Sequence, residues 1–256
     1  MIKTEHLTKT FGQKTAVSDL NLEVRGSEFF VFMGPNAAGK TTTIKLLTGL
    51  LRPTRGRVLI KGYDIQKQPL EAKRHIGYIP DMPFLYDKLT AREFLDFVSG
   101  IYDMEPKSAG QKAQGLLETF GILSAQDILV EDYSHGMRQR LVFCAALLHE
   151  PQVIIIDEPM VGLDPLAAKT VKEALKERTR QGATVFMSTH DLSLAEELAD
   201  RIGIINESRL IALGTVEELR GLKEAREGNL EEIFLRLVEE TKPEGVAVRV
   251  QRKAEA

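Results

Sequence analysis

A glycine-containing segment near the start of the chain has the residue types that phosphate binding needs. Residues 34–41 read Gly-Pro-Asn-Ala-Ala-Gly-Lys-Thr and fit the spacing GxxxxGK[ST]. Phosphate oxygens need several backbone N–H donors at close range, and glycine lets the backbone curl around them because it has no Cβ. The residues that we expect to contact phosphate are Gly34, Pro35, Asn36, Ala37, Ala38, Gly39, Lys40, Thr41 and Thr42.

Two side chains of this phosphate loop have distinct chemistry. Lys40 is a cation that can reach the β- and γ-phosphates of a nucleotide, and Thr41 can offer its hydroxyl to Mg²⁺. The loop follows a strand expected at 29–33 and opens a helix expected at 40–51, so the helix N-terminus adds partial positive charge. Ala37 replaces the usual glycine and fits only if that position is not left-handed. The loop alone does not distinguish kinases, GTPases and ATPases.

A second set of polar side chains ends a run of β-branched residues. Residues 153–156 are Val-Ile-Ile-Ile and lead directly into Asp157, Glu158 and Pro159. A strand buried on both faces of a parallel sheet has this composition, and ligands of such sheets bind at the carboxyl edge. On its own the pair of carboxylates could be a solvated strand end. Beside a phosphate loop, we expect Asp157 to hold Mg²⁺ through water and Glu158 to orient or deprotonate the attacking water.

One histidine is expected at the same edge. His190 follows the strand expected at 183–189, which lies next in the chain after the acidic strand. A lone histidine at a strand end is often structural. Because this edge also carries the phosphate loop and Asp157, we favour a contact with the γ-phosphate and a catalytic role. Metal ligation is disfavoured, since no second histidine or cysteine pairs with it.

Composition narrows the class of protein. The 256 residues carry a formal net charge of −3, so there is no basic signature for nucleic acid. A single cysteine, Cys144, excludes an internal disulfide and fits a reducing compartment. The N-terminus lacks the apolar stretch of a signal peptide, and no apolar run approaches the roughly 20 residues of a spanning helix. We therefore expect a cytoplasmic protein.

The elements that position these residues follow an α/β pattern with a helical interruption. Short strands are expected at 2–7, 16–24, 29–33, 57–60 and 75–79, helices over 90–149, and strand–helix–strand alternation over 153–210. The alternation implies a parallel sheet. The expected organisation is an α/β core at 1–85 and 150–215, a helical subdomain at 86–149, and a C-terminal helix with a disordered tail at 216–256.

A segment between the phosphate loop and the acidic strand makes the resemblance to a family specific. Residues 133–141 read Tyr-Ser-His-Gly-Met-Arg-Gln-Arg-Leu, where Ser134 has the character of a helix N-cap whose free N–H groups could bind an anion. The segment resembles the signature of ABC ATPases, and the resemblance covers residues 1–215 with every motif in order. Residues 162–165, Gly-Leu-Asp-Pro, are similar to the D-loop, His190 to the switch histidine, and Phe11 to the aromatic residue that stacks on adenine.

The resemblance implies a fold and a mechanism. The fold would be a P-loop NTPase core of the ABC type with an N-terminal antiparallel β region and a helical insert. Two chains, identical or different, would pair head to tail around ATP and Mg²⁺. Ser134 and Gly136 would then contact the nucleotide held by the partner, with Asp164 near the same interface. Hydrolysis would drive a separate integral membrane permease, which places the chain on the inner face of the membrane.

Besides Ala37, three positions depart from the family pattern. His135 replaces the first glycine of the signature, and Met137 replaces its glutamine. Asp81 stands where the family has a glutamine after Tyr-Ile-Pro. Its shorter side chain can still contact a water on Mg²⁺, so Asp81 is retained as a nucleotide and metal contact.

Two further segments bear on partners. Residues 228–237 are similar to a C-terminal helix of exporter-type ATPases, although a generic amphipathic helix has the same pattern. Residues 82–86, Met-Pro-Phe-Leu-Tyr, are an apolar run that either plugs the junction with the helical insert or faces a permease. An ABC ATPase acting on DNA or ribosomes and a small-molecule P-loop kinase remain alternatives, but neither accounts for the short insert, the single set of motifs and the ordered signature together.

Overall fold

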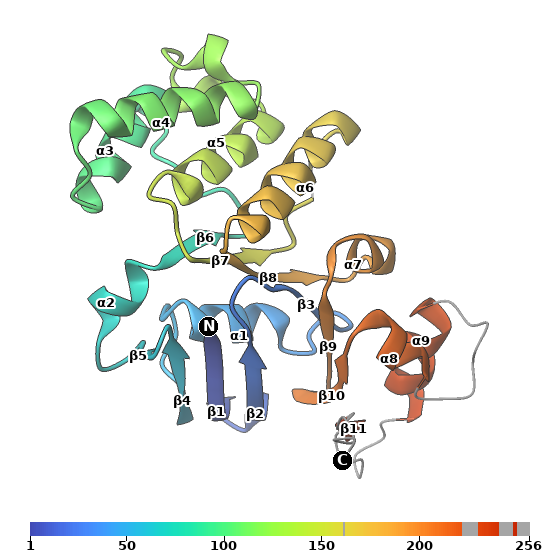
Figure 1. Cartoon of the computed structure of the whole chain (residues 1–256). Helices are drawn as coiled ribbons and strands as arrows, with labels where there is room; N and C mark the ends of the chain where they lie inside the picture. The colour runs from blue at the N-terminus through green and yellow to red at the C-terminus, as the bar shows by residue number, and fades with distance from the viewer. Residues whose placement is uncertain (161, 222–229, 241–247, 250–256) are drawn as a thin grey trace.

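The computed structural model describes residues 1–160, 162–221, 230–240 and 248–249 (Figure 1). The strands within them are β1 (Ile2–Phe11), β2 (Lys14–Val24), β3 (Phe29–Met33), β4 (Arg55–Ile60), β5 (Tyr63–Asp64), β6 (Ile76–Ile79), β7 (Val153–Asp157), β8 (Thr184–Thr189), β9 (Arg201–Asn206), β10 (Arg209–Gly214) and β11 (Val248–Arg249). The α-helices are α1 (Lys40–Leu47), α2 (Pro69–Lys73), α3 (Ala91–Ile101), α4 (Pro106–Thr119), α5 (His135–Leu147), α6 (Pro165–Arg180), α7 (Leu192–Leu198), α8 (Val216–Gly221) and α9 (Leu230–Glu240).

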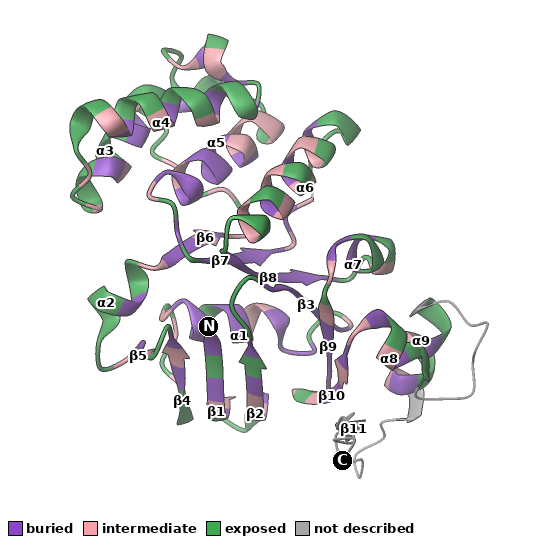
Figure 2. Cartoon of the chain, in the orientation of Figure 1, coloured by how far each residue is buried: buried purple, intermediate pink, exposed green. Residues whose placement is uncertain are grey.

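A seven-stranded sheet carries the core, in the order β11-β10-β9-β3-β8-β7-β6. The five strands from β9 to β6 pair in parallel, whereas β10 runs antiparallel to β9. Every residue of β3, β7 and β8 is buried, which explains the continuous apolar runs 29–33, 153–156 and 185–187 within them (Figure 2). The carboxyl ends of these three neighbouring strands therefore meet at one edge, and the polar residues that follow them are brought together.

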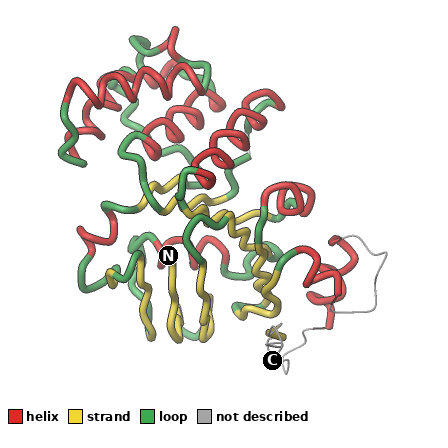
Figure 3. Tube along the Cα trace, in the orientation of Figure 1, coloured by secondary structure: helices red, strands yellow, loops and turns green. Residues whose placement is uncertain are grey.

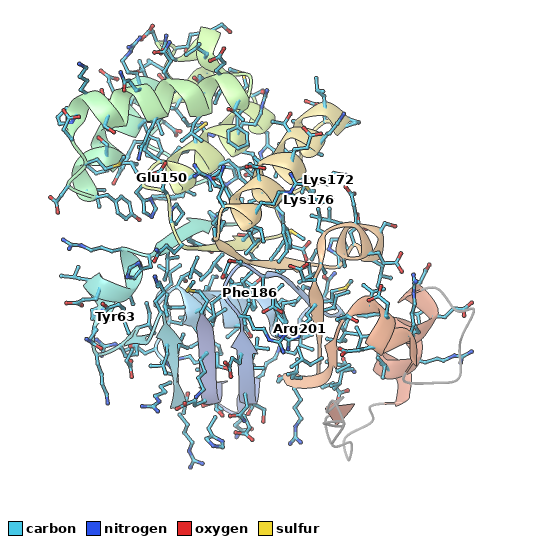
Figure 4. All side chains as sticks on the ribbon, viewed as in Figure 1. Tyr63, Glu150, Lys172, Lys176, Phe186 and Arg201 are labelled. Carbon is cyan, nitrogen blue, oxygen red and sulfur yellow. The ribbon has the colours of Figure 1, made fainter. Side chains whose placement is uncertain are left out.

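A second, antiparallel sheet covers one face of the first. Its order is β2-β1-β4-β5. A buried aromatic group lies in the core cluster shared by the two sheets and α1: Phe186 stacks on Phe30 with ring centroids 5.4 Å apart and lies at the same distance from Phe32. Phe186 is labelled in the interior in Figure 4. This cluster fixes β3 and β8 side by side beneath the phosphate loop.

The helices α3, α4 and α5 form an insert between β6 and β7, seen at the top of Figures 1 and 3. Thr90 starts α3 with a capping box, since its hydroxyl accepts from the Glu93 N–H while the Glu93 carboxylate accepts from the Thr90 N–H. Phe120 stacks on Phe143 of α5 at 5.7 Å. The insert thus has its own apolar packing and also joins the core cluster of the parallel sheet.

Several expected boundaries are wrong in extent. The first helix ends at Leu47 and not at residue 51, because Gly49 adopts a left-handed φ of 70° that stops the helix. The first two strands are longer than expected, since β1 and β2 pair as far as Phe11 and Lys14. Most of the tail expected to be disordered lies outside the described residues, but Val248–Arg249 pairs with β10.

No helix in the described part of the chain has the length and apolar character needed to cross a membrane.

Candidate functional site

The phosphate loop joins β3 to α1 and is packed tightly from behind. A Cβ at Gly34 would lie 2.3 Å from the carbonyl oxygen of Ile205, and one at Gly39 would lie 2.3 Å from that of Ala16. Gly39 also has a φ of 116°, a conformation that other residues rarely adopt. Glycine is therefore required at both positions, and the loop backbone is held against β9 and β2.

Lys40 is the first residue of α1 and is buried. Its Nζ donates hydrogen bonds to the carbonyl oxygens of Gly34 at 2.7 Å and Pro35 at 3.3 Å. It also lies 3.8 Å from Oε1 of Glu158, the residue that follows β7. The ammonium group thus spans the mouth of the loop, where the β- and γ-phosphates of a nucleotide would replace its carbonyl partners.

Asp157 lies at the end of β7 with no exposed surface. Its Oδ1 accepts a 2.5 Å hydrogen bond from the Ser188 hydroxyl, whereas Oδ2 has no hydrogen-bond partner in the part of the chain that the structure describes. Burial raises the pKa of Asp157, while the nearby Ser188 and Thr41 hydroxyls oppose that effect. A buried carboxylate oxygen without a partner is costly, so the site fits a cation.

The donor set suits Mg²⁺ bound together with a nucleotide. Among the described residues, no cluster of three or more histidine, cysteine, aspartate or glutamate side chains could hold a metal ion. Mg²⁺ prefers oxygen ligands and commonly completes its shell with water and substrate phosphates. Thr41 and Asp157 supply the protein oxygens of such a site, so the residues present fit the ion only when phosphate oxygens contribute.

Glu158 links the loop to the switch histidine. Its Oε2 lies 2.9 Å from Nδ1 of His190, and its other carboxylate oxygen faces Lys40. Its backbone has a left-handed φ of 47°, and its N–H donates to the carbonyl oxygen of Ser188 at 3.2 Å. A non-glycine residue in this conformation turns the chain sharply after β7 and aims the carboxylate back at the loop. The predicted juxtaposition of Lys40, Glu158 and His190 is present in the structure.

Two other predicted contacts lie at the rim. Phe11 is 49% exposed, and the Nζ of Lys9 lies 4.9 Å from the ring centroid, so the ring has surface free for stacking. Asp81 is exposed, and its Oδ1 accepts from the N–H of Met82 at 2.9 Å. Asp81 is close enough to Asp157 to contribute to the raised pKa of the buried carboxyl. Both side chains are exposed, and their contacts with a nucleotide stay predictions.

The signature segment is separate from the phosphate loop of its own chain. The Ser134 hydroxyl accepts from the N–H of Met137 at 3.3 Å, which makes it the N-cap of α5 as the sequence predicts. Within the described residues no hydrogen bond joins Ser134 to the phosphate loop. His135 covers Gly162, because a Cβ at Gly162 would lie 2.3 Å from the imidazole Cδ2. The signature therefore contacts the D-loop segment of its own chain.

Asp164 has a structural role in this arrangement. Its Oδ1 accepts from the N–H groups of Leu166 at 3.0 Å and Ala167 at 2.9 Å, so it caps α6. These bonds lower the pKa of Asp164, and the N–H of Ala167 makes the largest contribution. Oδ1 of Asp164 is thus bound to its own helix, and only Oδ2 could contact a nucleotide.

Comparison with known proteins decides the family. Residues 17–161, the larger part of the chain, match the family described as ABC transporter. The chain belongs to this family as an ATP-binding protein. The bacitracin transport ATP-binding protein BcrA of Bacillus licheniformis is 40% identical over 212 residues, covering 82% of this chain and 68% of BcrA. The probable multidrug ABC transporter ATP-binding protein YbhF of Escherichia coli is 34% identical over 93% of this chain, which spans only 42% of YbhF.

Solved ABC structures share the fold. The ATP-binding subunit of an ABC transporter superposes with a TM-score of 0.89 at 32% identity, covering 93% of this chain and 99% of that chain. A dimeric post-hydrolysis state of the ATP-binding cassette MJ0796, bound to ADP and Pi, has a TM-score of 0.77 at 25% identity, covering 84% of this chain and 98% of its own. The predicted P-loop fold of the ABC ATPase type is thus confirmed.

One site residue of the ABC cassette was missed by sequence reasoning. Ser188 bonds Oδ1 of Asp157 through its hydroxyl, and both its carbonyl and its hydroxyl lie within 3.3 Å of the Glu158 N–H. It pairs directly with Asp157 in the register of β7 and β8. The sequence does show a hydroxyl residue near the end of the strand before His190. Only the strand register reveals that this hydroxyl bonds Asp157 and the Glu158 N–H.

Position 37 is left-handed in the structure, so an alanine does not fit there without strain. Its φ is 64°, so an alanine occupies the left-handed region that glycine usually fills in this loop. The left-handed conformation costs a non-glycine residue roughly 1–2 kcal/mol, whereas glycine loses about 0.4–1 kcal/mol through the freedom of the unfolded chain. The strain is the larger of the two effects.

We therefore expect Ala37→Gly to raise the free energy of unfolding slightly, by about 0.5–1 kcal/mol, with MgATP affinity equal or higher. Ala38→Gly is the matched control, because Ala38 is 4% exposed and has no positive φ. The control should destabilise the chain. The free energy of unfolding of both variants is measured in urea. A loss of stability in Ala37→Gly as large as that in Ala38→Gly would contradict the claim that the backbone at Ala37 is strained.

Proposed function

We propose that this chain is the ATP-hydrolysing subunit of an ABC exporter, which works as a head-to-tail dimer on a separate membrane permease. One observation carries the hydrolytic part of the proposal. The Glu158 carboxylate lies between the buried ammonium of Lys40, at 3.8 Å, and the ring of His190, at 2.9 Å, beside a phosphate loop. The arrangement supports a cation for the γ-phosphate and a base for the attacking water, side by side at the mouth of the loop.

The residues divide the chemistry between them. Backbone N–H groups of the loop and the Lys40 ammonium bind the phosphates, and Phe11 stacks on the base. Glu158 accepts the proton of the attacking water, while the hydrogen bond with His190 orients its carboxylate. Thr41 and Asp157 would hold Mg²⁺, with Asp81 acting through water, and the ion would neutralise charge on the phosphates.

The proposed dimer follows from the position of the signature. Ser134 and the half-buried Gly136 open α5, whose N-terminal N–H groups can bind an anion, yet Ser134 makes no hydrogen bond to its own phosphate loop in the described residues. MJ0796, a relative in fold, is dimeric in a post-hydrolysis state. We assign the γ-phosphate contacts of Ser134 and Gly136 to the nucleotide of a partner chain, identical or different.

An exposed apolar surface supports a membrane partner. Met82, Phe84 and Tyr86 are 75%, 84% and 51% exposed, and Tyr86 packs edge-to-face on Phe97 of α3. Phe84 therefore does not plug the junction, although Leu85 packs against the core. We assign this surface to the permease, residues 86–149 to a helical subdomain that begins where the surface ends, and the chain to the cytoplasmic face of the membrane. The names of BcrA and YbhF favour export.

Glu158→Gln should keep nucleotide binding and lose hydrolysis. Loss of a general base typically slows a reaction about 10²–10⁴-fold, and the shape of the side chain is retained. The variant should accumulate as an ATP-bound dimer, seen by light scattering with MgATP present. Adding Ser134→Arg to the same chain should restore the monomer, and that monomer should still bind nucleotide. Near-normal turnover in Glu158→Gln would move the base elsewhere, and loss of nucleotide binding by the Ser134→Arg monomer would contradict the assignment across the interface.

Phe84→Asp tests the permease surface in the assembled transporter. The substitution should leave the thermal midpoint and ATP binding unchanged, because the side chain is already exposed, and should abolish association with the cognate permease. Leu70→Asp is a matched control, since Leu70 is 75% exposed on α2. Co-purification with the permease reads out both variants. Normal assembly of Phe84→Asp would place the docking surface elsewhere.

A further inference from the structure

A strained two-residue turn joins β9 to β10. Glu207 and Ser208 both have left-handed backbones, with φ values of 44° and 69°. Two-residue hairpin turns with positive φ at both central positions favour Asn-Gly, because most side chains are strained there. This chain keeps two residues with side chains in that conformation, so the contacts of the turn with the rest of the molecule become informative.

Ser208 makes three hydrogen bonds away from its hairpin. Its N–H donates to the carbonyl oxygen of Ala38 at 3.1 Å, and its own carbonyl accepts from the N–H of Ser18 at 2.8 Å. Its hydroxyl donates to the carbonyl oxygen of Thr15 at 2.7 Å. A single residue thus ties the phosphate loop, through Ala38, to β2.

The end of β9 lies against the same loop. The carbonyl oxygen of Ile205 lies so close to Gly34 that a Cβ there would be 2.3 Å away, and the Ile205 Cδ1 would lie 3.2 Å from a Cβ at Gly39. Ala38, which accepts the bond from Ser208, is almost fully buried. The backbone of residues 205–208 therefore forms a wall against the loop at Gly34, Ala38 and Gly39.

A further hydrogen bond extends this wall to the C-terminal helix. The buried Asn206 donates from Nδ2 to the carbonyl oxygen of Val238 in α9 at 3.2 Å. Ile233 and Leu237 of the same helix are buried in the core. The end of α9 is thus fixed to a residue two positions before Ser208.

We propose that Ser208 is a positioning residue for the phosphate loop, and that Asn206 extends this support to α9. The hydroxyl bond to Thr15 holds the turn in its left-handed form, and the turn in that form presents the N–H that fixes Ala38. A loop fixed in this way keeps its N–H donors converged before phosphate arrives. The effect on nucleotide affinity rests on the proposed function, whereas the effect on the loop itself does not.

The test compares Ser208→Gly with Ser208→Ala in the full chain. Both remove the hydroxyl bond, but only glycine also relieves the left-handed strain. Ser99→Ala is the control, since the Ser99 hydroxyl donates to the carbonyl oxygen of Asp96 within α3 and makes no contact with the loop. Three quantities are measured: the dissociation constant for MgATP by calorimetry, the thermal midpoint, and hydrogen exchange of the peptide covering residues 34–40 without nucleotide.

If Ser208 positions the loop, the MgATP affinity of its variants should not follow their thermal midpoint. Ser208→Gly should keep or raise the thermal midpoint yet bind MgATP more weakly by about 3- to 10-fold, the loss expected for one hydrogen bond. Ser208→Ala should weaken binding by a similar factor and lower the midpoint. Both should speed exchange at residues 34–40, and Ser99→Ala should change neither binding nor that exchange.

Two results would overturn the inference. MgATP affinity that simply follows the thermal midpoint, with Ser208→Gly binding as wild type does, would reduce Ser208 to a structural residue. Unchanged hydrogen exchange at residues 34–40 in both Ser208 variants would also show that Ser208 does not position the loop, and this result does not depend on nucleotide binding. If the wild-type chain itself does not bind MgATP, the proposed function fails, and the exchange measurement still decides the role of Ser208.

Asn206→Ala tests the link to α9. It should speed exchange in the phosphate loop and weaken MgATP binding about 3-fold or more through loss of one hydrogen bond. Asn21→Ala is its control, because among the described residues the Asn21 amide bonds the His6 N–H and the Asp19 carbonyl of the antiparallel sheet and no others. If loop hydrogen exchange and MgATP affinity are the same in Asn206→Ala and Asn21→Ala, the claim that α9 supports the phosphate loop is wrong.

Discussion

The burial of charge at the carboxyl edge of the parallel sheet is the constraint on which the rest of the structure depends. Lys40 is 7% exposed and Asp157 is fully buried. Ionised groups in such positions need partners, since a buried unpaired charge costs several kcal/mol. Lys40 has two carbonyl oxygens and a distant carboxylate, and Asp157 has only one of its oxygens bonded among the described residues. In the function proposed above, a nucleotide with Mg²⁺ would supply the missing phosphate and cation partners for both.

The fold brings the charged side chains together at this edge of the sheet. The apolar strands β3, β7 and β8 end together, so Asp157, Glu158 and His190 reach the loop from neighbouring strands. The glycines of the loop allow close contact with β2 and β9, and Ser208 holds that contact from behind. The helical insert holds Ser134 without a hydrogen bond to the phosphate loop in the described residues, which leaves Ser134 for the second chain of the proposed dimer. The exposed apolar surface of Met82, Phe84 and Tyr86 lies on the segment between β6 and the insert, next to Asp81 in sequence.

Features that depend on local chemistry could be predicted from the sequence. The phosphate loop, the carboxylates after the β-branched run and the Ser134 cap each rest on a few adjacent residues. Features set by packing between distant segments could not. The left-handed Ala37, the bond between Ser188 and Asp157, and the imidazole of His135 over Gly162 arise from strand register and close backbone approach. The early end of α1 also depends on a single glycine conformation that the apolar spacing conceals.

The most direct test of the account measures MgATP binding to Lys40→Ala by titration calorimetry, with Lys45→Ala as a control on the exposed face of the same helix. Removing a charged hydrogen-bond donor from a desolvated site should weaken binding by about tenfold or more. The control should bind as the wild-type chain does, and both variants should remain folded by thermal unfolding. A dissociation constant for Lys40→Ala within about threefold of wild type would contradict the claim that buried charge at this edge is completed by nucleotide.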